Sequence, residues 1–238
     1  GETDPGMSDG ADSKAALRKS MRSTLRALSQ DAIAAASERA CARAAALTVG
    51  AAAVSVYLAM PKAEASTSAL LQSLFARSVR VYVPRVEGPG REDMRMLHVA
   101  DAASLESYPR SKWHIPEPTD EQAALMEDGL ATAAIEAVIV PAVAFDASCR
   151  RLGQGKGFYD TFLGKLQAAR VARGLPPART IGLGLQEQLT AEVPVDAHDV
   201  PLDYVCLPDV LLTRVPPPTP AAEPPATASE PAASSADG

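Results

Sequence analysis

Residues 135–160 read Ile-Glu-Ala-Val-Ile-Val-Pro-Ala-Val-Ala-Phe-Asp-Ala-Ser-Cys-Arg-Arg-Leu-Gly-Gln-Gly-Lys-Gly-Phe-Tyr-Asp. Residues 135–140 are a nearly all-apolar run, rich in β-branched side chains, which is typical of a strand buried on both faces. A long helix is expected over residues 158–173, and the loop before it carries three alternating glycines. A buried strand that leads through a loop into a helix is a unit of α/β proteins with a parallel sheet.

The same alternation of helices and strands is expected over the rest of the chain. The apolar spacing predicts a helix over residues 13–28, with Ser13 as its N-cap, and a second, alanine-rich helix capped by Ser29. Further helices are expected over residues 66–77 and 121–126. Strands are expected over residues 53–60, 79–83 (stopped by Pro84), 94–99, 180–183 and, as the last strand, 204–207. The sequence therefore predicts an α/β three-layer domain with a mostly parallel central sheet flanked by helices.

Composition sets the domain boundaries. The 238 residues include 20 prolines, of which seven crowd the segment after Arg214 together with Ala, Ser, Thr and Glu. Such a segment has too few apolar side chains to fold alone. We therefore expect one domain over residues 13–213, a disordered N-terminal segment over residues 1–12 and a disordered tail over residues 214–238.

Charge and cysteine content exclude several classes of protein. Lys and Arg number 23 against 29 Asp and Glu, so a net charge of −6 argues against wrapping DNA or coating an anionic membrane. The sequence has no apolar run of about 18 residues and no secretory leader, and three scattered cysteines support neither a disulfide framework nor structural zinc. We expect a soluble, cytoplasmic monomer without membrane or nucleic-acid partners. An alanine- and arginine-rich N-terminal helix also fits a mitochondrial protein, although Asp9 and Asp12 argue against it.

The glycine-rich loop predicts an anion site. Glycines let the backbone turn tightly and bring N–H groups against a ligand, and the following helix N-terminus favours negative charge. Arg151 and Lys156 strengthen this interpretation, and Asp160 is the nearest carboxylate for a cation. The alternative is a flexible loop with solvated charges, and the spacing matches neither the P-loop nor the dinucleotide fingerprint. The residues alone leave both interpretations open.

A second basic feature lies on the first expected helix. Lys14, Arg18, Arg22 and Arg26 recur every four residues, which places them on one face beside an apolar stripe. Charges with this spacing usually form a solvated face, and we prefer that interpretation for Arg22 and Arg26.

The stretch from Arg151 to Asp160, with Pro141–Asp146 before it, resembles the signature of the 5-formyltetrahydrofolate cyclo-ligase family. Agreement continues over residues 14–207 in several motifs, in the order Lys14-x-x-Leu17-Arg18, Tyr57-Leu58-Ala59-Met60, Glu64-Ala65-Ser66-Thr67, Pro84-Arg85, Trp113-x-Ile115-Pro116-x-Pro118, Val193-Pro194 and Asp199 to Asp203. The resemblance implies an ATP-dependent enzyme that closes 5-formyltetrahydrofolate to 5,10-methenyltetrahydrofolate and releases ADP and phosphate.

The resemblance also implies roles for individual residues. ATP would be bound by Lys14, Arg18, Arg151, Gly153, Gly155, Lys156, Gly157, Phe158 and Tyr159, of which Lys156 and Arg151 would act in catalysis. Mg²⁺ would be held by Asp160 and Asp199, whereas Asp203 is expected to be structural. The folate would be bound by Leu58, Glu64, Trp113, Gly155 and Tyr159. For Trp113 and Tyr159, ordinary packing is the alternative.

Two rival functions remain to be distinguished from this enzyme. One is a non-catalytic protein of the same fold that binds a nucleotide or folate, and the other is a relative of sugar-phosphate isomerases or acyl-CoA transferases. The motifs of the latter group are absent, and the intact set of Lys14, Arg18, Lys156, Asp160 and Asp199 favours the enzyme over the binding protein. The three histidines, His98, His114 and His198, do not cluster, and none is assigned a catalytic role.

Overall fold

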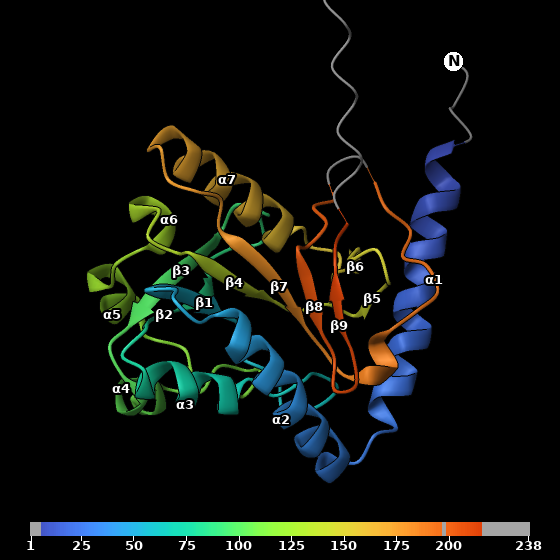
Figure 1. The fold of residues 1–238 in the computed structure, drawn as a ribbon, viewed down its shortest axis with the longest axis horizontal. Coiled ribbons are helices and arrows are strands. Elements are labelled where there is room, and N and C mark those ends of the chain that lie inside the picture. The colour runs from blue at the N-terminus through green and yellow to red at the C-terminus, as the bar shows by residue number, and fades with distance from the viewer. Residues whose placement is uncertain (1–5, 197–198, 216–238) are drawn as a thin grey trace, which may run out of the picture.

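The computed structural model describes residues 6–196 and 199–215. Its centre is a seven-stranded sheet with the order β3-β2-β1-β4-β7-β8-β9 (Figure 1). The strands of this sheet are β1 (Ala53–Val56), β2 (Arg80–Val86), β3 (Met94–Val99), β4 (Ala137–Val140), β7 (Arg179–Leu183), β8 (Tyr204–Cys206) and β9 (Leu211–Thr213). The five inner strands pair in parallel, and β3 and β9 add antiparallel edges.

Helices cover both faces of the sheet. The helical segments are α1 (Gly6–Arg26), α2 (Gln30–Leu47), α3 (Ser68–Ala76), α4 (Ala102–Ser107), α5 (Asp120–Leu125), α6 (Gly129–Thr132), α7 (Phe158–Ala172) and the 3₁₀ turn η1 (Gln186–Gln188). Figure 1 shows α2 and α3 on one side of the sheet and α7 on the other. The predicted three-layer α/β architecture with a mostly parallel sheet is therefore confirmed.

Strand β4 shows why this chain needs two covering layers. All four of its residues are buried. Ile139 packs into the cluster built with α2 and α3, whereas Val138 and Val140 pack into the cluster built with α7. Successive side chains of a strand point to opposite faces, so an all-apolar strand requires apolar cover on both.

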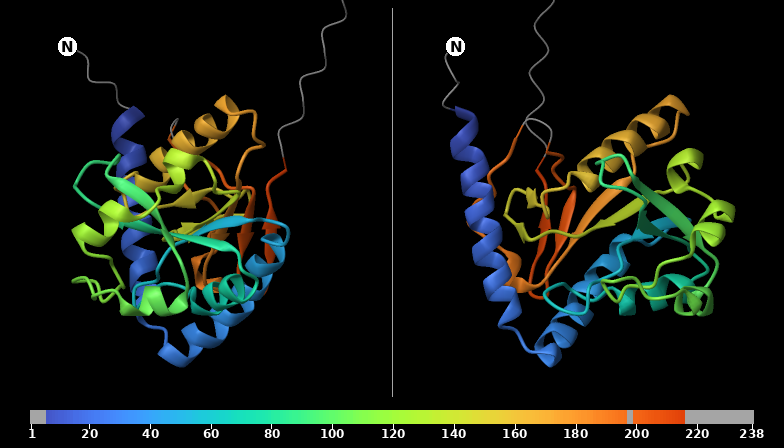
Figure 2. Two further views of the ribbon diagram at one scale, coloured as in Figure 1. Left: turned by 90° about the vertical axis from the view of Figure 1, so that its left-hand side faces the viewer. Right: turned by 180° about the vertical axis from the view of Figure 1, so that it is seen from behind.

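Helix α1 lies apart from these two layers, at one side of the sheet (Figure 2). Its apolar stripe, Leu17 and Met21, packs against Val143, Leu152 and Val193. Leu152 belongs to a two-stranded hairpin of β5 (Ala144–Phe145) and β6 (Arg151–Leu152), which follows β4 and precedes the glycine-rich loop. The basic side of α1 is thereby brought to that loop.

Several expected boundaries are wrong. Helix α1 begins at Gly6, so Ser13 lies within it and is not the N-cap. Strand β1 ends at Val56, because Tyr57 enters a turn in which its hydroxyl donates to Ala65 and its carbonyl accepts from Thr67. Strand β2 continues through Pro84 to Val86, since beyond Tyr82 it pairs only with β3 and proline is tolerated where one side of a strand is unpaired.

Some of the remaining elements agree with the predictions from sequence, and others were not predicted. Ser29 is the N-cap of α2 and accepts a hydrogen bond from the N–H of Ala32. Strand β9 lies beyond the strand expected to be last, and α4, α6 and the β5–β6 hairpin are too short to leave a periodic pattern. Of the segments expected to be disordered, residues 1–5 and 216–238 lie outside the described part, whereas α1 includes residues 6–12. No helix of the described ranges is long and apolar enough to cross a membrane.

Candidate active site

A pocket of about 510 Å³ opens at the carboxyl end of β4, where ligands bind in open α/β sheets. It lies between the glycine-rich loop, the basic side of α1, the loop after β1 and the loop after η1. Its lining residues are Lys14, Arg18, Glu64, Arg91, Pro141, Ala142, residues 151–161, Asp196 and Asp199.

The glycine-rich loop has a backbone that other residues adopt only with strain. Gly155 and Gly157 have φ angles of +100° and +72°, and Gly157 is the N-cap of α7. A Cβ atom on Gly155 would lie 3.5 Å from the guanidinium carbon of Arg18. The loop can therefore bring its backbone close to a ligand at the N-terminus of a 15-residue helix, which is favourable for an anion.

Three successive turns of α1 hold the loops of the pocket. Lys14 Nζ donates to Asp196 Oδ2 at 2.7 Å and to Asp199 Oδ2 at 2.5 Å. Arg18 Nε donates to the Gly153 carbonyl at 2.9 Å. Burial works against the charged form of Lys14, but the hydrogen bonds to the two aspartates outweigh it and raise the pKa of Lys14.

Arg22 is half-buried, and its Nη2 donates to Gln154 Oε1 at 2.6 Å in an exposed contact with the tip of the glycine-rich loop. Arg26 is exposed, as expected. The basic side of α1 thus contacts the loop as far as Arg22, one turn further along than the sequence suggested.

Arg151 and Asp160 form a largely buried ion pair beneath the loop. Arg151 Nη2 lies 2.5 Å from Asp160 Oδ1, and only 4% of the Arg151 side chain is exposed. The same carboxylate oxygen accepts the N–H of Val200 at 3.2 Å. Arg151 Nε is buried without a hydrogen-bond partner among the described residues. A guanidinium that keeps an unused donor beside a pocket can still bind an anion.

Two largely buried polar side chains, Glu64 and Tyr159, also line the pocket. Glu64 Oε2 accepts the N–H of Met60 at 2.9 Å, and burial raises the pKa of Glu64 to about 7. Burial, and then the neighbouring Glu64, raise the pKa of Tyr159 well above its ordinary value. The Tyr159 hydroxyl is buried and has no hydrogen-bond partner within the described part of the chain. A ligand that forms hydrogen bonds with both groups would remove the energetic cost of burying them without such partners.

The carboxylates of the pocket fit a magnesium ion that arrives with a nucleotide. Asp160 and Asp199 both line the pocket and are linked through the backbone of Val200. In residues 6–196 and 199–215 there is no group of three or more His, Cys, Asp or Glu side chains that could hold a metal. Mg²⁺ is commonly held by one or two carboxylates plus substrate phosphates, so two hard oxygen donors suffice.

The sequence model of the 5-formyltetrahydrofolate cyclo-ligase family matches residues 11–208. The chain belongs to this family. The predictions of the family and of an enzyme are thereby confirmed.

Relatives and solved structures agree with this membership. A probable 5-formyltetrahydrofolate cyclo-ligase of Schizosaccharomyces pombe is 33% identical over 165 residues, which cover 68% of this chain and 78% of that protein. An Arabidopsis thaliana relative named as mitochondrial is 34% identical over 140 residues, or 58% of this chain and 50% of the relative. The structure of an Aquifex aeolicus 5,10-methenyltetrahydrofolate synthetase has a TM-score of 0.64 at 22% identity and covers 84% of this chain and 92% of its own, which shows the shared fold.

Most of the residues that the cyclo-ligase resemblance singled out meet in one pocket. They are Lys14, Arg18, Glu64, Arg151, Gly153, Gly155, Lys156, Gly157, Phe158, Tyr159, Asp160 and Asp199. Leu58 is buried in the core beside α2 and α3 and is not among the lining residues. Trp113 is 57% exposed beside Lys112, on a loop that does not line the pocket.

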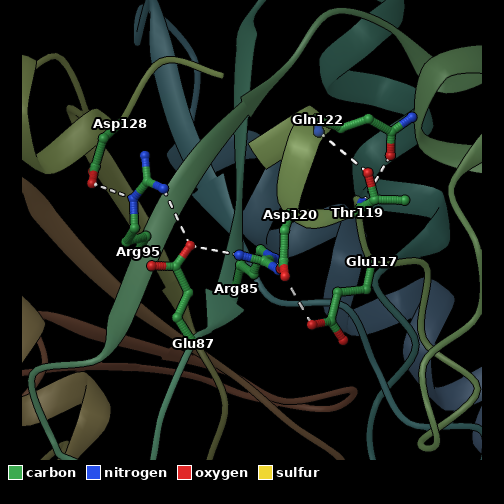
Figure 3. A network of polar contacts seen from close by, with 8 residues as sticks. All are labelled: Arg85, Glu87, Arg95, Glu117, Thr119, Asp120, Gln122 and Asp128. Carbon is green, nitrogen blue, oxygen red and sulfur yellow. Dashed lines mark hydrogen bonds and ion pairs between the residues drawn. The ribbon is translucent and has the colours of Figure 1, made fainter. Parts of the chain in front are cut away.

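The loop that carries Trp113 is instead tied to the sheet by Arg85, another residue of the resemblance (Figure 3). Arg85 pairs with Glu87 on one side and with Asp120 on the other, and Glu117 lies 4.0 Å from its Nε. Arg95 extends the network from Glu87 to Asp128. These alternating charges fasten the end of the loop to β2 and β3.

Other assignments concern residues outside the pocket. Asp203 accepts from the N–H and hydroxyl of Thr180 and pairs with Arg214, a pattern that ties β7 to β8. His98 lies beside the Tyr82 ring, 5.3 Å between centroids, and His114 lies in the loop with Trp113. His198 is outside the described residues.

Sequence reasoning missed three polar groups that line the cyclo-ligase pocket, Arg91, Thr161 and Asp196. Asp196 could have been found, because it lies one turn before Asp199 and shares Lys14 with it. Arg91 gave no local signal, since it reaches the pocket from the hairpin between β2 and β3.

Proposed function

We propose that the protein uses ATP and Mg²⁺ to convert 5-formyltetrahydrofolate to 5,10-methenyltetrahydrofolate, with release of ADP and phosphate. The observation that carries the proposal is a single pocket with two chemically different ends. One end has the glycine-rich loop with Arg18 and Lys156, which suits phosphates. The other has a buried carboxylate and phenol, Glu64 and Tyr159, which suit a flat heterocycle with N–H groups.

The reaction explains why phosphate and folate need to share a pocket. The formyl oxygen of the substrate is a poor leaving group. Its attack on the γ-phosphorus forms a P–O bond, while the bond from that phosphorus to ADP breaks. The folate N10 then attacks the activated carbon, the C–O bond breaks, and phosphate leaves as N10 loses its proton to solvent. The ring closes without a nucleophile from the protein.

Catalysis of such a transfer depends mainly on positioning and on neutralising charge. We assign the neutralising role to Lys156 and Arg151, with Lys14 and Arg18 binding the remaining phosphate oxygens. Arg18 already fixes the loop through Gly153, so the loop is preorganised before ATP binds. Asp160 and Asp199 would hold Mg²⁺, which supplies positive charge to the phosphates. Their present partners, Arg151 and Lys14, would then be released toward the phosphates.

Glu64 and Tyr159 are assigned to the pterin. An ionised Glu64 can accept hydrogen bonds from a ring N–H and an amino group, and pairing with these donors would stabilise the charged form that burial disfavours. Tyr159 offers both a ring face and a hydroxyl whose hydrogen bond is unmade in the free protein. The cytoplasmic location and the monomeric state stay predictions.

The test is the absorbance of the methenyl product when the protein is mixed with 5-formyltetrahydrofolate, magnesium and ATP. We expect the band to grow with ATP and to stay flat in an ATP-free control. A Lys156→Ala variant should lose most of the rate, whereas Lys19→Ala on the exposed side of α1 should keep it. A flat trace from a protein that still binds folate and ATP at equilibrium would replace the proposal by the non-catalytic binding protein.

A further inference from the structure

The turn between β2 and β3, residues 87–93, is closed by hydrogen bonds. The N–H of Glu87 donates to the Asp93 carbonyl at 2.8 Å, and the N–H of Asp93 donates to the Gly90 carbonyl at 3.0 Å. The Asp93 carboxylate accepts the N–H of Gly90 at 2.8 Å. A Cβ on Gly88 would lie 2.4 Å from that carboxylate, so a larger residue there would displace the Asp93 side chain.

This turn is fastened to the helix that begins at the glycine-rich loop. The Glu92 carboxylate pairs with the ammonium of Lys165 on α7. The neighbouring Arg91 lies at the start of α7, where its Cβ is 3.8 Å from the position of a Cβ added to Gly157. Arg91 consequently lines the pocket from an element that belongs to none of the motifs described above.

Arg91, like Lys156, differs in charge pairing from Lys14 and Arg151. Lys14 and Arg151 are neutralised by aspartates, and Arg18 donates to a carbonyl. Arg91 has no hydrogen bond or ion pair with the described residues and is exposed at the mouth of the pocket. The neighbouring Glu92 feels the charge of Arg91 but forms its ion pair with Lys165. An exposed guanidinium without an ion pair of its own is suited to an anionic group of a ligand.

Two anions enter this pocket under the proposed function, the phosphates of ATP and the glutamyl tail of the folate. Arg18 lies beside Gly153 and Gly155 at one end of the glycine-rich loop, together with Lys14 and Asp199. Arg91 lies at the other end, beside Gly157. That end leads directly into Tyr159, which we assign to the pterin. In folate, the pterin is followed by an aminobenzoyl group and then by glutamate, the only anionic part of the molecule.

Resting on the proposed function, we propose that Arg91 binds a carboxylate of the glutamyl tail of the folate substrate. Its place at the exposed mouth fits a tail that leaves the pocket. Each further glutamate of a polyglutamylated folate adds carboxylates near this guanidinium. The proposal makes Arg91 a determinant of folate specificity.

The experiment compares wild type with Arg91→Ala on three substrates: 5-formyltetrahydrofolate, its triglutamate and the primary amide of 5-formyltetrahydropteroate, an uncharged pteroate that has no carboxylate. The matched control is Arg39→Ala, which removes an exposed arginine with one surface partner, Asp209, away from the pocket. Steady-state kinetics give KM for each folate and for ATP, and calorimetry gives Kd for each folate without turnover.

We expect Arg91→Ala to raise KM and Kd about fivefold for the monoglutamate, more for the triglutamate, and not at all for the pteroate. KM for ATP should stay unchanged, and Arg91→Lys should recover part of the loss. A rise in KM for ATP would move Arg91 to the phosphate site and overturn the inference, as would an equal loss on the pteroate. If wild type forms no methenyl product, the proposed reaction fails, while the three Kd values still decide whether Arg91 binds the tail.

Discussion

Lys14 Nζ lies 2.5 Å from Asp199 Oδ2, although 185 positions separate the two residues in the chain. The contact joins the first helix to the loop that follows η1, across the mouth of the pocket. It is well shielded, since 10% of the Lys14 side chain and 19% of the Asp199 side chain are exposed. Helix α1 therefore lines the pocket and is not only a cover for the β5–β6 hairpin.

The first prediction concerns this contact. Lys14→Met keeps the apolar stem of the side chain but leaves Asp199 without this cation. The free energy of unfolding should fall by about 1–2 kcal/mol, because a shielded carboxylate loses its partner. KM for ATP should rise about tenfold or more, since a phosphate contact is lost. Urea denaturation and steady-state kinetics measure the two effects.

Lys19→Met is the control for this variant, because Lys19 is exposed on the same helix. It should change neither quantity. A Lys14→Met protein with the KM for ATP of the wild type would remove Lys14 from the phosphate site.

The second prediction separates catalysis from folding at Lys156. This side chain is exposed in the glycine-rich loop and has no hydrogen bond or ion pair with the described residues. Lys156→Ala should therefore leave Tm unchanged while kcat/KM falls about 100-fold or more, because charge on the transferring phosphoryl group is no longer neutralised. Thermal unfolding and initial rates test this pair of outcomes. Unchanged kinetics would show that the loop does not bind the reacting phosphate.

The third prediction uses the pKa of Glu64, which burial raises to about 7. In the unfolded chain a glutamate titrates near its ordinary value of about 4.3, so between these values the folded protein binds the additional proton. The contribution of Glu64 to stability is present at low pH and is lost as pH rises through 7. At pH 8 the buried charge should cost roughly 3–4 kcal/mol.

Glu64→Gln removes this cost while keeping the shape of the side chain. The variant should be more stable than wild type at pH 8 and similar to it at pH 4.5 in urea denaturation. Its folate affinity should be weaker at pH 8, since an amide is a poorer acceptor for the pterin N–H groups. A variant that loses stability at pH 8 would mean that Glu64 is already satisfied as an anion in the free protein.

The fourth prediction compares two glycines with different backbone conformations. Gly155 has a φ of +100° and faces Arg18, whereas Gly164 lies within α7 with nothing within 4 Å of an added Cβ. Gly155→Ala should destabilise the protein by about 1–2 kcal/mol and reduce activity, because the loop must change shape. Gly164→Ala should stabilise it by about 0.5–1 kcal/mol with activity unchanged. Equal behaviour of the two variants would contradict the assigned role of the loop backbone.

The layers of the fold could be predicted from the sequence more reliably than the edge of the sheet and the short elements. Continuous apolar strands such as β4 leave only one solution, cover on both faces, and the long helix α7 follows from its spacing. Strand β9 depends on pairing with β8, beside which the Arg214 N–H donates to the Asp203 carbonyl. The short helices α4 and α6 each begin at a single capping aspartate, Asp101 or Asp128, and are too short to leave a periodic pattern. The prediction that Pro84 stops the strand is wrong because a proline is tolerated in a strand where the neighbouring strand has already ended.

In the candidate site too, the proximity of sequence neighbours could be predicted, whereas contacts between distant segments could not. The glycine-rich loop, Lys156 and Asp160 are contiguous in sequence, so their proximity could be predicted. The contacts of Arg22 with Gln154 and of Arg91 with the start of α7 depend on how α1 and the β2–β3 turn pack, which no local pattern encodes. Trp113 was selected as an aromatic within a motif, but in the free protein its loop is fastened by Arg85 outside the pocket.

The measurement that tests the central claim most directly follows the formyl oxygen. The protein is given 5-formyltetrahydrofolate labelled with ¹⁸O at that oxygen, together with ATP and magnesium, and the released phosphate is analysed by mass spectrometry. Transfer of the γ-phosphoryl group to the formyl oxygen predicts one ¹⁸O atom in each phosphate formed with the methenyl product. Phosphate without the label, at the same yield of product, would contradict the account.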